Sequence, residues 1–154
     1  KNFYPDANST LRITYGKVKG YNPRDGVTYK HFTTLDGLME KENPNSDEFM
    51  VSPKLKDLCN KKDYGQYADK DGKLHIAFLA ANHTTGGNSG SPVLNGKGEL
   101  IGTNYDRVWE GTMSDIMYNP DICRNVSLDV RYTLFVIDKY AGAGYLLSEM
   151  KIDK

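Results

Sequence analysis

The chain has 154 residues, a length that suits one domain able to bury a core without disulfide staples or a structural metal. Its 20 basic and 20 acidic residues cancel, which argues against a nucleic-acid backbone or an anionic membrane surface as a partner. No apolar run approaches the roughly 18 residues that a membrane-spanning helix needs.

The N-terminal segment is expected to form a strand. The chain opens on KNFYPD, with neither an initiator Met nor a signal-peptide pattern, so we expect a mature chain or a piece of a longer one. Within residues 9–21, Leu11, Ile13 and Tyr15 alternate with polar residues. That period of two is typical of a half-buried strand.

Two short helices are predicted in the polar region that follows. They cover TTLDGLMEKE at 33–42 and SPKLKDLCNKKDYG at 52–65. In the second helix, Ser52 is placed to cap the first turn and Pro53 occupies the first helical position. The sequence therefore predicts where this helix begins.

The two cysteines, Cys59 and Cys123, give no sign of a metal site. They lie far apart, without a CxxC pair and without a histidine at metal-ligand spacing. We expect no metal and no cofactor. Free thiols and a single disulfide both remain open from the sequence.

Strands are predicted around the middle of the chain and a helix at its end. LHIAFLA at 74–80 and PVLNGKGELIGTNY at 92–105 are apolar runs, and NGKG divides the second into a hairpin. The segment 126–152 is predicted to start a helix near Ser127 and to end it at Gly142 or Gly144. The alternation of Val130, Tyr132, Leu134 and Val136 leaves a strand over those residues as the alternative.

A glycine-rich turn, TTGGNSGSPV at 84–93, connects the two strand regions. A serine hydroxyl attacks a carbonyl only if a base removes its proton and donors receive the charge that forms on oxygen. The backbone N–H groups of Gly87 and Ser89 can supply those donors if the chain turns sharply. We therefore take Ser89 as a candidate nucleophile, although Gly-x-Ser-Gly alone also occurs in ordinary loops.

The turn GNSGSP closely resembles the nucleophile turn of trypsin-like serine peptidases, in the form with Asn where the digestive enzymes have Asp. The segments 3–27, 33–44, 83–93 and 127–140 resemble the end of the bacterial dipeptidyl-peptidase 7 and 11 family. The resemblance implies a serine exopeptidase that removes dipeptides from peptide N-termini. It also implies a fold that is mainly β, with short helices and a C-terminal helix.

The same resemblance implies that residues 1–154 form the C-terminal portion of a peptidase domain. This portion is the second barrel of a chymotrypsin-like double β-barrel, and the first barrel and an inserted helical domain are absent from it. A catalytic triad needs a histidine and an acid beside the serine. In the resembled family these belong to the first barrel, so we assign none of His31, His75 and His83 as the base. The isolated chain is expected to be inactive.

Substrate selection is predicted at Arg107 and Asp106, on the strand after the turn. The resemblance to the type 11 enzymes implies that Arg107 holds an Asp or Glu before the cleaved bond, as a guanidinium can through two parallel hydrogen bonds. The alternative is a surface ion pair with Asp106 or Glu110. Asp106 is implied to hold the substrate ammonium, but neighbours on a regular strand point to opposite faces, so both can face a substrate only if the strand bulges or ends there.

Two other functions compete with this interpretation. A trypsin-like glutamyl endopeptidase also uses a GNSGSP-like turn, and a peptidase-like module could bind peptides without cutting them. The expected partners are peptides with a free N-terminus, the remainder of the parent chain and, as an option, a second copy in a homodimer. Nucleic acid and membrane are not expected partners. The resemblance implies the bacterial periplasm or the cell surface as the location.

Overall fold

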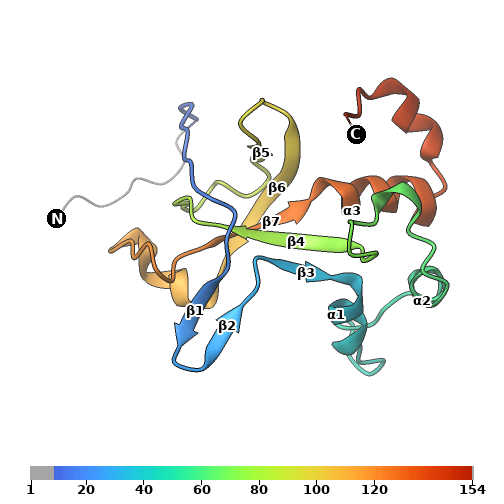
Figure 1. Cartoon of the computed structure of the whole chain (residues 1–154), viewed down its shortest axis with the longest axis horizontal. Helices are drawn as coiled ribbons and strands as arrows, with labels where there is room; N and C mark the ends of the chain where they lie inside the picture. Colours follow the sequence, from blue (N-terminus) through green and yellow to red (C-terminus); the bar gives the residue numbers. More distant parts are fainter. Residues whose placement is uncertain (1–8, 154) are drawn as a thin grey trace. The chain divides into compact units, whose positions relative to one another are not determined.

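The structure, a computed structural model, describes residues 9–153, which form seven strands and a set of short helices (Figure 1). Five strands make one sheet in the order β3–β4–β7–β6–β5, and β1 and β2 make a separate antiparallel hairpin. The strands are β1 Tyr21–Arg24, β2 Val27–Tyr29, β3 Phe32–Thr34, β4 His75–Ala80, β5 Pro92–Leu94, β6 Leu100–Arg107 and β7 Asn125–Asp129. The sheet and the short helices agree with the mainly β fold that was predicted.

The helices are all short. The α-helices are α1 Leu35–Glu40, α2 Pro53–Asn60 and α3 Val130–Phe135, the 3₁₀ helices are η1 Gly65–Tyr67, η2 Trp109–Asp115 and η4 Gly144–Glu149, and the π-helix is η3 Val136–Tyr140. Helix η3 follows α3 without a break. None of the helices among residues 9–153 has the length and apolar character needed to cross a membrane.

The described chain divides into two compact units. The first unit comprises residues 9–32 and 77–129, and the second comprises residues 33–76 and 130–153. The first unit contains the β1–β2 hairpin, β5, β6, β7 and the larger part of β4. The candidate site lies entirely within this unit.

The predicted hairpin and the predicted cap of the second helix are both confirmed. Strands β5 and β6 pair in antiparallel fashion across the turn at residues 95–98, where Asn95 Oδ1 accepts hydrogen bonds from the N–H groups of Lys97 and Glu99. In α2, the Ser52 hydroxyl oxygen accepts from the N–H of Leu55, and Pro53 begins the helix. Both features depend on side chains a few residues away, which is why the sequence predicts them.

The strand predicted within residues 9–21 is wrong. Residues 11–17 form no strand, and Leu11, Ile13 and Tyr15 are 89%, 85% and 92% exposed. Val18 makes only an isolated bridge with Ala80 before β1 begins at residue 21. The alternation of apolar side chains is present, but no described part of the chain packs against it.

The start predicted for the C-terminal helix is also wrong. Ser127 lies in the middle of β7, which pairs with β4 on one side and β6 on the other, and the helix begins at Val130. Buried and half-buried residues alternate along β7, as expected of a strand inside a sheet. The end was predicted correctly, because the helical segment stops at Tyr140 and Gly142 adopts a φ of 70°.

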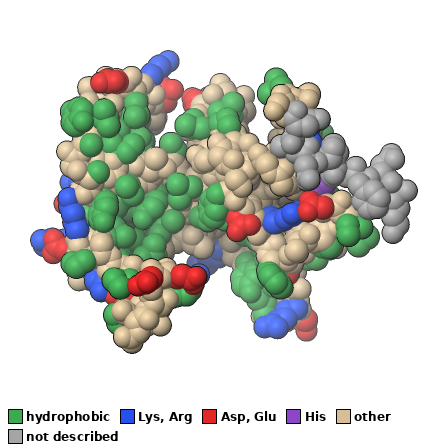
Figure 2. Space-filling model, turned by 180° about the vertical axis from the view of Figure 1, so that it is seen from behind, with side chains coloured by type: hydrophobic (Ala, Val, Ile, Leu, Met, Phe, Trp, Pro, Cys, Tyr) green, Lys and Arg blue, Asp and Glu red, His purple; other side chains and the backbone are tan. Residues whose placement is uncertain are grey.

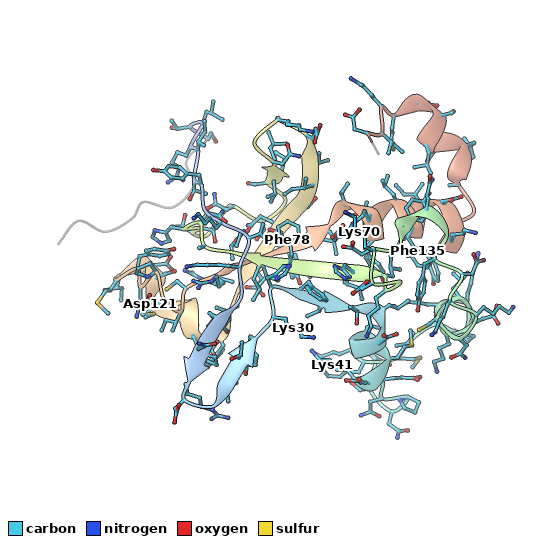
Figure 3. All side chains as sticks on the ribbon, in the orientation of Figure 1. Lys30, Lys41, Lys70, Phe78, Asp121 and Phe135 are labelled. Atoms are coloured by element: carbon cyan, nitrogen blue, oxygen red, sulfur yellow. The ribbon has the colours of Figure 1, made fainter. Side chains whose placement is uncertain are left out.

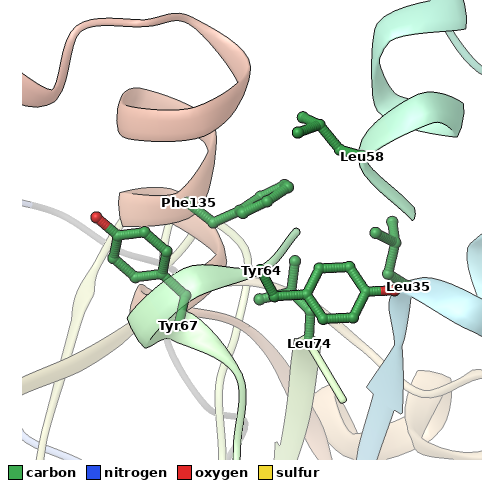
Figure 4. Close-up of a cluster of buried hydrophobic side chains, with 6 residues drawn as sticks. All are labelled: Leu35, Leu58, Tyr64, Tyr67, Leu74 and Phe135. Atoms are coloured by element: carbon green, nitrogen blue, oxygen red, sulfur yellow. The ribbon is translucent and has the colours of Figure 1, made fainter. Parts of the chain in front are cut away.

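A cluster of aromatic and leucine side chains forms the core of the second unit (Figure 4). Its members are Leu35, Leu58, Tyr64, Tyr67, Leu74 and Phe135. Phe135, labelled on α3 in Figure 3, is fully buried, and its ring contacts Tyr64 and Tyr67 edge to face at centroid distances of 6.3 and 6.4 Å. Burial of one such side chain stabilises the fold by about 1.5–3 kcal/mol.

Hydrophobic side chains also gather on one face of the molecule (Figure 2). In the second unit a pocket of about 430 Å³ is lined by apolar residues that include Leu38, Phe49, Met50 and Tyr132.

Both cysteines are free thiols, with Cys123 buried and Cys59 half-buried, so the question that the sequence left open is settled against a disulfide. The described residues contain no group of three or more potential metal ligands.

Candidate functional site

The glycine-rich turn joins β4 to β5, and its shape depends on two glycines. Gly87 and Gly90 have φ values of 87° and 86°, in the region that side-chain-bearing residues rarely adopt. Nothing lies within 4 Å of the point where a Cβ on Gly90 would be, so the requirement there comes from the backbone conformation and not from crowding. The two glycines flank the segment that carries Ser89.

Asn88 folds this turn back on itself. Its Oδ1 accepts a hydrogen bond of 2.8 Å from the N–H of Thr85, and its own N–H donates to the Thr85 carbonyl at 3.2 Å. The N–H of Ser91 then donates to the Asn88 carbonyl at 3.0 Å. An asparagine side chain commonly stabilises such turns by bonding to nearby backbone groups. Asn88 therefore has a structural role in the GNSGSP turn.

The turn is held against β6, the strand that carries the other predicted residues. The N–H of Gly90 donates to the Asn104 carbonyl at 2.8 Å, and the N–H of Asn104 donates to the Ser91 carbonyl at 2.9 Å. Ser89 itself is exposed, and its hydroxyl donates to the carbonyl of Tyr105 at 3.2 Å. The structure thus brings the predicted nucleophile beside the strand that ends at Arg107.

A network of buried polar side chains on β6 and β7 holds the turn through the Asn88 carbonyl. The sequence analysis did not predict it. Asn104 Nδ2 donates to the Asn88 carbonyl at 3.0 Å. Asn125 Nδ2 donates to Asn104 Oδ1 at 2.9 Å and to the Ser127 hydroxyl at 3.1 Å. Asn104, Asn125 and Ser127 are all buried, where each unsatisfied polar group would be unfavourable by about 1–3 kcal/mol. The sequence signal was polar residues at the inward positions of two strands.

Strand β6 bulges next to the predicted substrate-binding residues. Asn104 pairs with Ser127 of β7 and Asp106 with the residue just before Ser127, so Tyr105 is an extra residue on β6. Tyr105 and Asp106 are consecutive and both exposed, which a regular strand with one buried face does not allow. The strand ends one residue later. The strand thus bulges just before Asp106 and ends at Arg107, and the roles of both residues toward a substrate stay a prediction.

The guanidinium of Arg107 forms an ion pair with neither of the acids, Asp106 and Glu110, that the alternative interpretation named. The backbone N–H of Arg107 donates to Asp106 Oδ1 at 2.8 Å, and Glu110 accepts from a tyrosine hydroxyl elsewhere. Its guanidinium instead contacts Asp115 Oδ1 and Oδ2 at 2.8 and 2.6 Å and the Ser114 hydroxyl at 2.7 Å. The guanidinium lowers the pKa of Asp115 below its ordinary value, and the hydrogen bond from Arg107 is the main cause.

Each of the three histidines contacts groups other than the Ser89 hydroxyl. His31 packs against a neighbouring phenylalanine ring, and His75 is paired with two aspartate side chains. The ring of His83 lies over Tyr118 with the centroids 4.8 Å apart. Burial lowers the pKa of His83 below its ordinary value, so its ring is neutral near pH 7. The prediction that none of the three is the base for Ser89 remains a prediction.

Comparison with known proteins identifies a family. The profile of the Peptidase S46 family matches residues 1–152. The Asp/Glu-specific dipeptidyl-peptidases of Capnocytophaga gingivalis and Flavobacterium psychrophilum are each 62% identical to this chain, over 98% and 97% of it. The alignments cover 21% of each relative, so the chain spans about a fifth of the length of these curated relatives.

A solved structure shares the fold. The crystal structure of Porphyromonas endodontalis DPP11 in complex with the dipeptide Arg-Asp matches with a TM-score of 0.92 and 57% sequence identity. The match covers 97% of this chain and 22% of that one. A second crystal structure of the same protein, in complex with the dipeptide Arg-Glu, matches with a TM-score of 0.89 over 91% of this chain.

Proposed function

Because this chain belongs to the Peptidase S46 family, we propose that it is the nucleophile-bearing part of a serine dipeptidyl-peptidase. The whole enzyme releases dipeptides from peptide N-termini, with Asp or Glu before the cleaved bond. The observation that carries the proposal is the turn around Ser89, whose exposed hydroxyl lies beside the strand that presents Asp106 and Arg107. The names of the relatives, which are Asp/Glu-specific dipeptidyl-peptidases, support the acidic preference.

In this proposal Ser89 attacks the peptide carbonyl and forms an acyl-enzyme, which water then hydrolyses. The N–H groups of Gly87 and Ser89 form the oxyanion hole. Neither donates to an acceptor within the described chain, and the positive φ of Gly87 sets the direction of the turn. Loss of one oxyanion donor typically raises the barrier by about 3–4 kcal/mol, so a fixed hole contributes strongly to the rate.

The base and its orienting acid come from the remainder of the parent chain. The Ser89 hydroxyl bonds to the Tyr105 carbonyl and not to an imidazole, which is consistent with that division. Without a base the isolated chain is inactive. In the parent enzyme this part is the second barrel of a chymotrypsin-like double β-barrel. The three alternating apolar side chains Leu11, Ile13 and Tyr15, exposed in this chain, would then pack against the missing part.

Arg107 selects the acidic side chain and Asp106 holds the ammonium of the substrate. The bulge in β6 supports this division, since it exposes Asp106 just before the half-buried Arg107 at the strand end. An ammonium bound by Asp106 and a carboxylate bound by Arg107 would mark the two ends of a dipeptide unit. Such a pair of contacts would explain why cleavage follows the second residue from a free N-terminus.

The preference for cleavage after the second residue from a free N-terminus can be tested with the full-length enzyme and two fluorogenic dipeptides that carry Asp before the cleaved bond. One has a free N-terminus and the other is acetylated. We expect acetylation, and separately Asp106→Ala with the free substrate, to lower kcat/KM by at least about 30-fold, because each removes one partner of the charge pair that the bound substrate would shield from water. Asp121→Asn serves as the control, since Asp121 is an exposed aspartate of the same unit (Figure 3).

Equal cleavage of the free and the acetylated substrate would contradict the proposal and would favour a glutamyl endopeptidase. If acetylation lowers kcat/KM as expected but Asp106→Ala does not, the enzyme is still a dipeptidyl-peptidase. The substrate ammonium is then bound by a group other than Asp106.

A further inference from the structure

Asp115 and Arg107 form a planar, two-point ion pair within the first unit. Arg107 Nη1 lies 2.8 Å from Asp115 Oδ1, and Nη2 lies 2.6 Å from Oδ2. Nη1 also donates to the Ser114 hydroxyl at 2.7 Å. Such parallel contacts fix the plane and the direction of a guanidinium, which a single charge contact does not.

The geometry leaves one edge of the guanidinium for a ligand. A guanidinium carries five N–H donors, and Asp115 and Ser114 accept from three of those of Arg107. The other two are the Nε–H and the second hydrogen of Nη2, which lie side by side along the other edge of the fork. Neither donates to another residue of the described chain. Two parallel donors of this kind match the two oxygens of a second carboxylate.

The partners of Arg107 are themselves held in place. Ser114 is buried, and both it and Asp115 lie in η2, which is separated from β6 only by Val108 and turns the chain back toward Arg107. The N–H of Val108, between β6 and η2, donates to the Arg124 carbonyl at 3.0 Å. The buried Arg124 side chain in turn donates to four backbone carbonyls, including that of Gly20. The segment that carries Asp115, the acid that orients Arg107, is therefore anchored to the rest of the unit by hydrogen bonds.

We propose that Asp115 is a positioning residue for substrate selection: it holds the end of the Arg107 guanidinium so that the Nε–Nη2 edge receives the acidic side chain of the substrate. This inference rests on the proposed function, in which Arg107 selects that side chain. Asp115 does not contact the substrate. Its carboxylate is ionised throughout the neutral range, because Arg107 lowers its pKa.

The ion pair has a second consequence for selection. Asp115 compensates the charge of Arg107, so net charge attracts an incoming substrate carboxylate only weakly. Binding of that carboxylate then depends on the two directed hydrogen bonds from the Nε–Nη2 edge. Arg107 has also lost its rotamer freedom before the substrate arrives, since its side chain is only 25% exposed and is fixed at three donors. Selection therefore follows the position of the fork more than its charge.

The test compares full-length enzymes on reporters with Asp, Glu or Leu before the cleaved bond. Asp115→Asn keeps the size of the side chain but removes one acceptor, so the two-point contact is lost. We expect kcat/KM for the Asp and Glu reporters to fall about 10- to 100-fold, mainly through KM, because the guanidinium is misplaced. We expect the Leu reporter to change by less than about twofold. Asp121→Asn is the matched control.

A double variant separates this inference from the proposed function. If Arg107→Gly removes the acidic preference, then adding Asp115→Asn to it should produce no further loss on the acidic reporters, since the two residues act as a unit. An unchanged or improved kcat/KM of Asp115→Asn on acidic reporters would overturn the positioning role while the role of Arg107 stands. An equal loss on all three reporters would also overturn it, because it would indicate general damage to the fold. If Arg107→Gly keeps the preference, the proposed role of Arg107 itself is wrong.

Discussion

Ser89→Ala in the full-length enzyme is expected to lower kcat on dipeptide reporters by about 10⁴- to 10⁶-fold, because the acyl-enzyme can no longer form. KM should change much less, since the hydroxyl contributes little to binding of the ground state. The hydroxyl donates to the Tyr105 carbonyl at 3.2 Å, and the turn itself is held by other groups, so the variant should fold normally. Steady-state kinetics with a matched thermal unfolding curve would measure both effects.

Ser91→Ala provides the control in the same turn. The hydrogen bonds that Ser91 makes to Asn88 and Asn104 come from its backbone, and they persist when the hydroxyl is removed. This variant should retain activity within a small factor. Similar losses in Ser89→Ala and Ser91→Ala would assign the effect to the shape of the turn and would contradict a nucleophile at Ser89.

Arg107→Gly is expected to remove the preference for Asp and Glu before the cleaved bond. Loss of one partner of a hydrogen-bonded charge pair that is shielded from water is worth about 2–5 kcal/mol, which corresponds to roughly 30-fold or more in kcat/KM. The loss should fall on acidic reporters, while an apolar reporter should be cleaved as well as before or better. The ratio of kcat/KM values for the Glu and Leu reporters is the quantity to measure.

Arg107→Lys refines this experiment. A lysine keeps the charge but cannot offer two parallel donors, so it should restore only a small part of the acidic preference. Full restoration by lysine would show that charge alone selects the substrate. An unchanged ratio in Arg107→Gly would show that the selecting group lies elsewhere.

The features that the sequence predicted correctly are governed by short-range interactions. The start of α2 follows from Ser52 and Pro53, and the β5–β6 hairpin follows from the turn at residues 95–98. In the glycine-rich turn, the positive φ angles of Gly87 and Gly90 are also a local requirement. In each case the residues that determine the geometry lie within a few positions of one another.

The features that the sequence did not predict depend on partners far along the chain. Residues 11–15 have the period of a strand, yet no described strand pairs with them. Ser127 lies in a strand because β4 and β6 flank it, and the alternation of Val126 and Leu128 with polar residues is too short to show this by itself. The ion pair between Arg107 and Asp115 depends on the path of η2, and no periodic signal in the sequence marks it. The surface ion pair with Asp106 or Glu110 that the sequence offered as an alternative is wrong, because the guanidinium contacts Asp115 instead.

The turn around Ser89 and the strand beside it thus depend both on short-range interactions and on partners far along the chain. Local glycines shape the turn, whereas Asn104 and Asn125 hold it from two strands that are distant in sequence. The bulge at Tyr105 belongs to the second kind as well, because it exists only in the pairing of β6 with β7. This combination places the exposed hydroxyl of Ser89 against the carbonyl of Tyr105, which precedes the exposed Asp106 and the half-buried Arg107 at the end of β6.

The most direct measurement is to treat the full-length enzyme with a serine-directed fluorophosphonate and to locate the adduct by peptide mass spectrometry. We expect one phosphonylated residue, Ser89, at a stoichiometry that rises in step with the loss of activity. A fully inhibited enzyme whose adduct lies on a different residue, or an active enzyme that takes up no reagent at Ser89, would contradict the account.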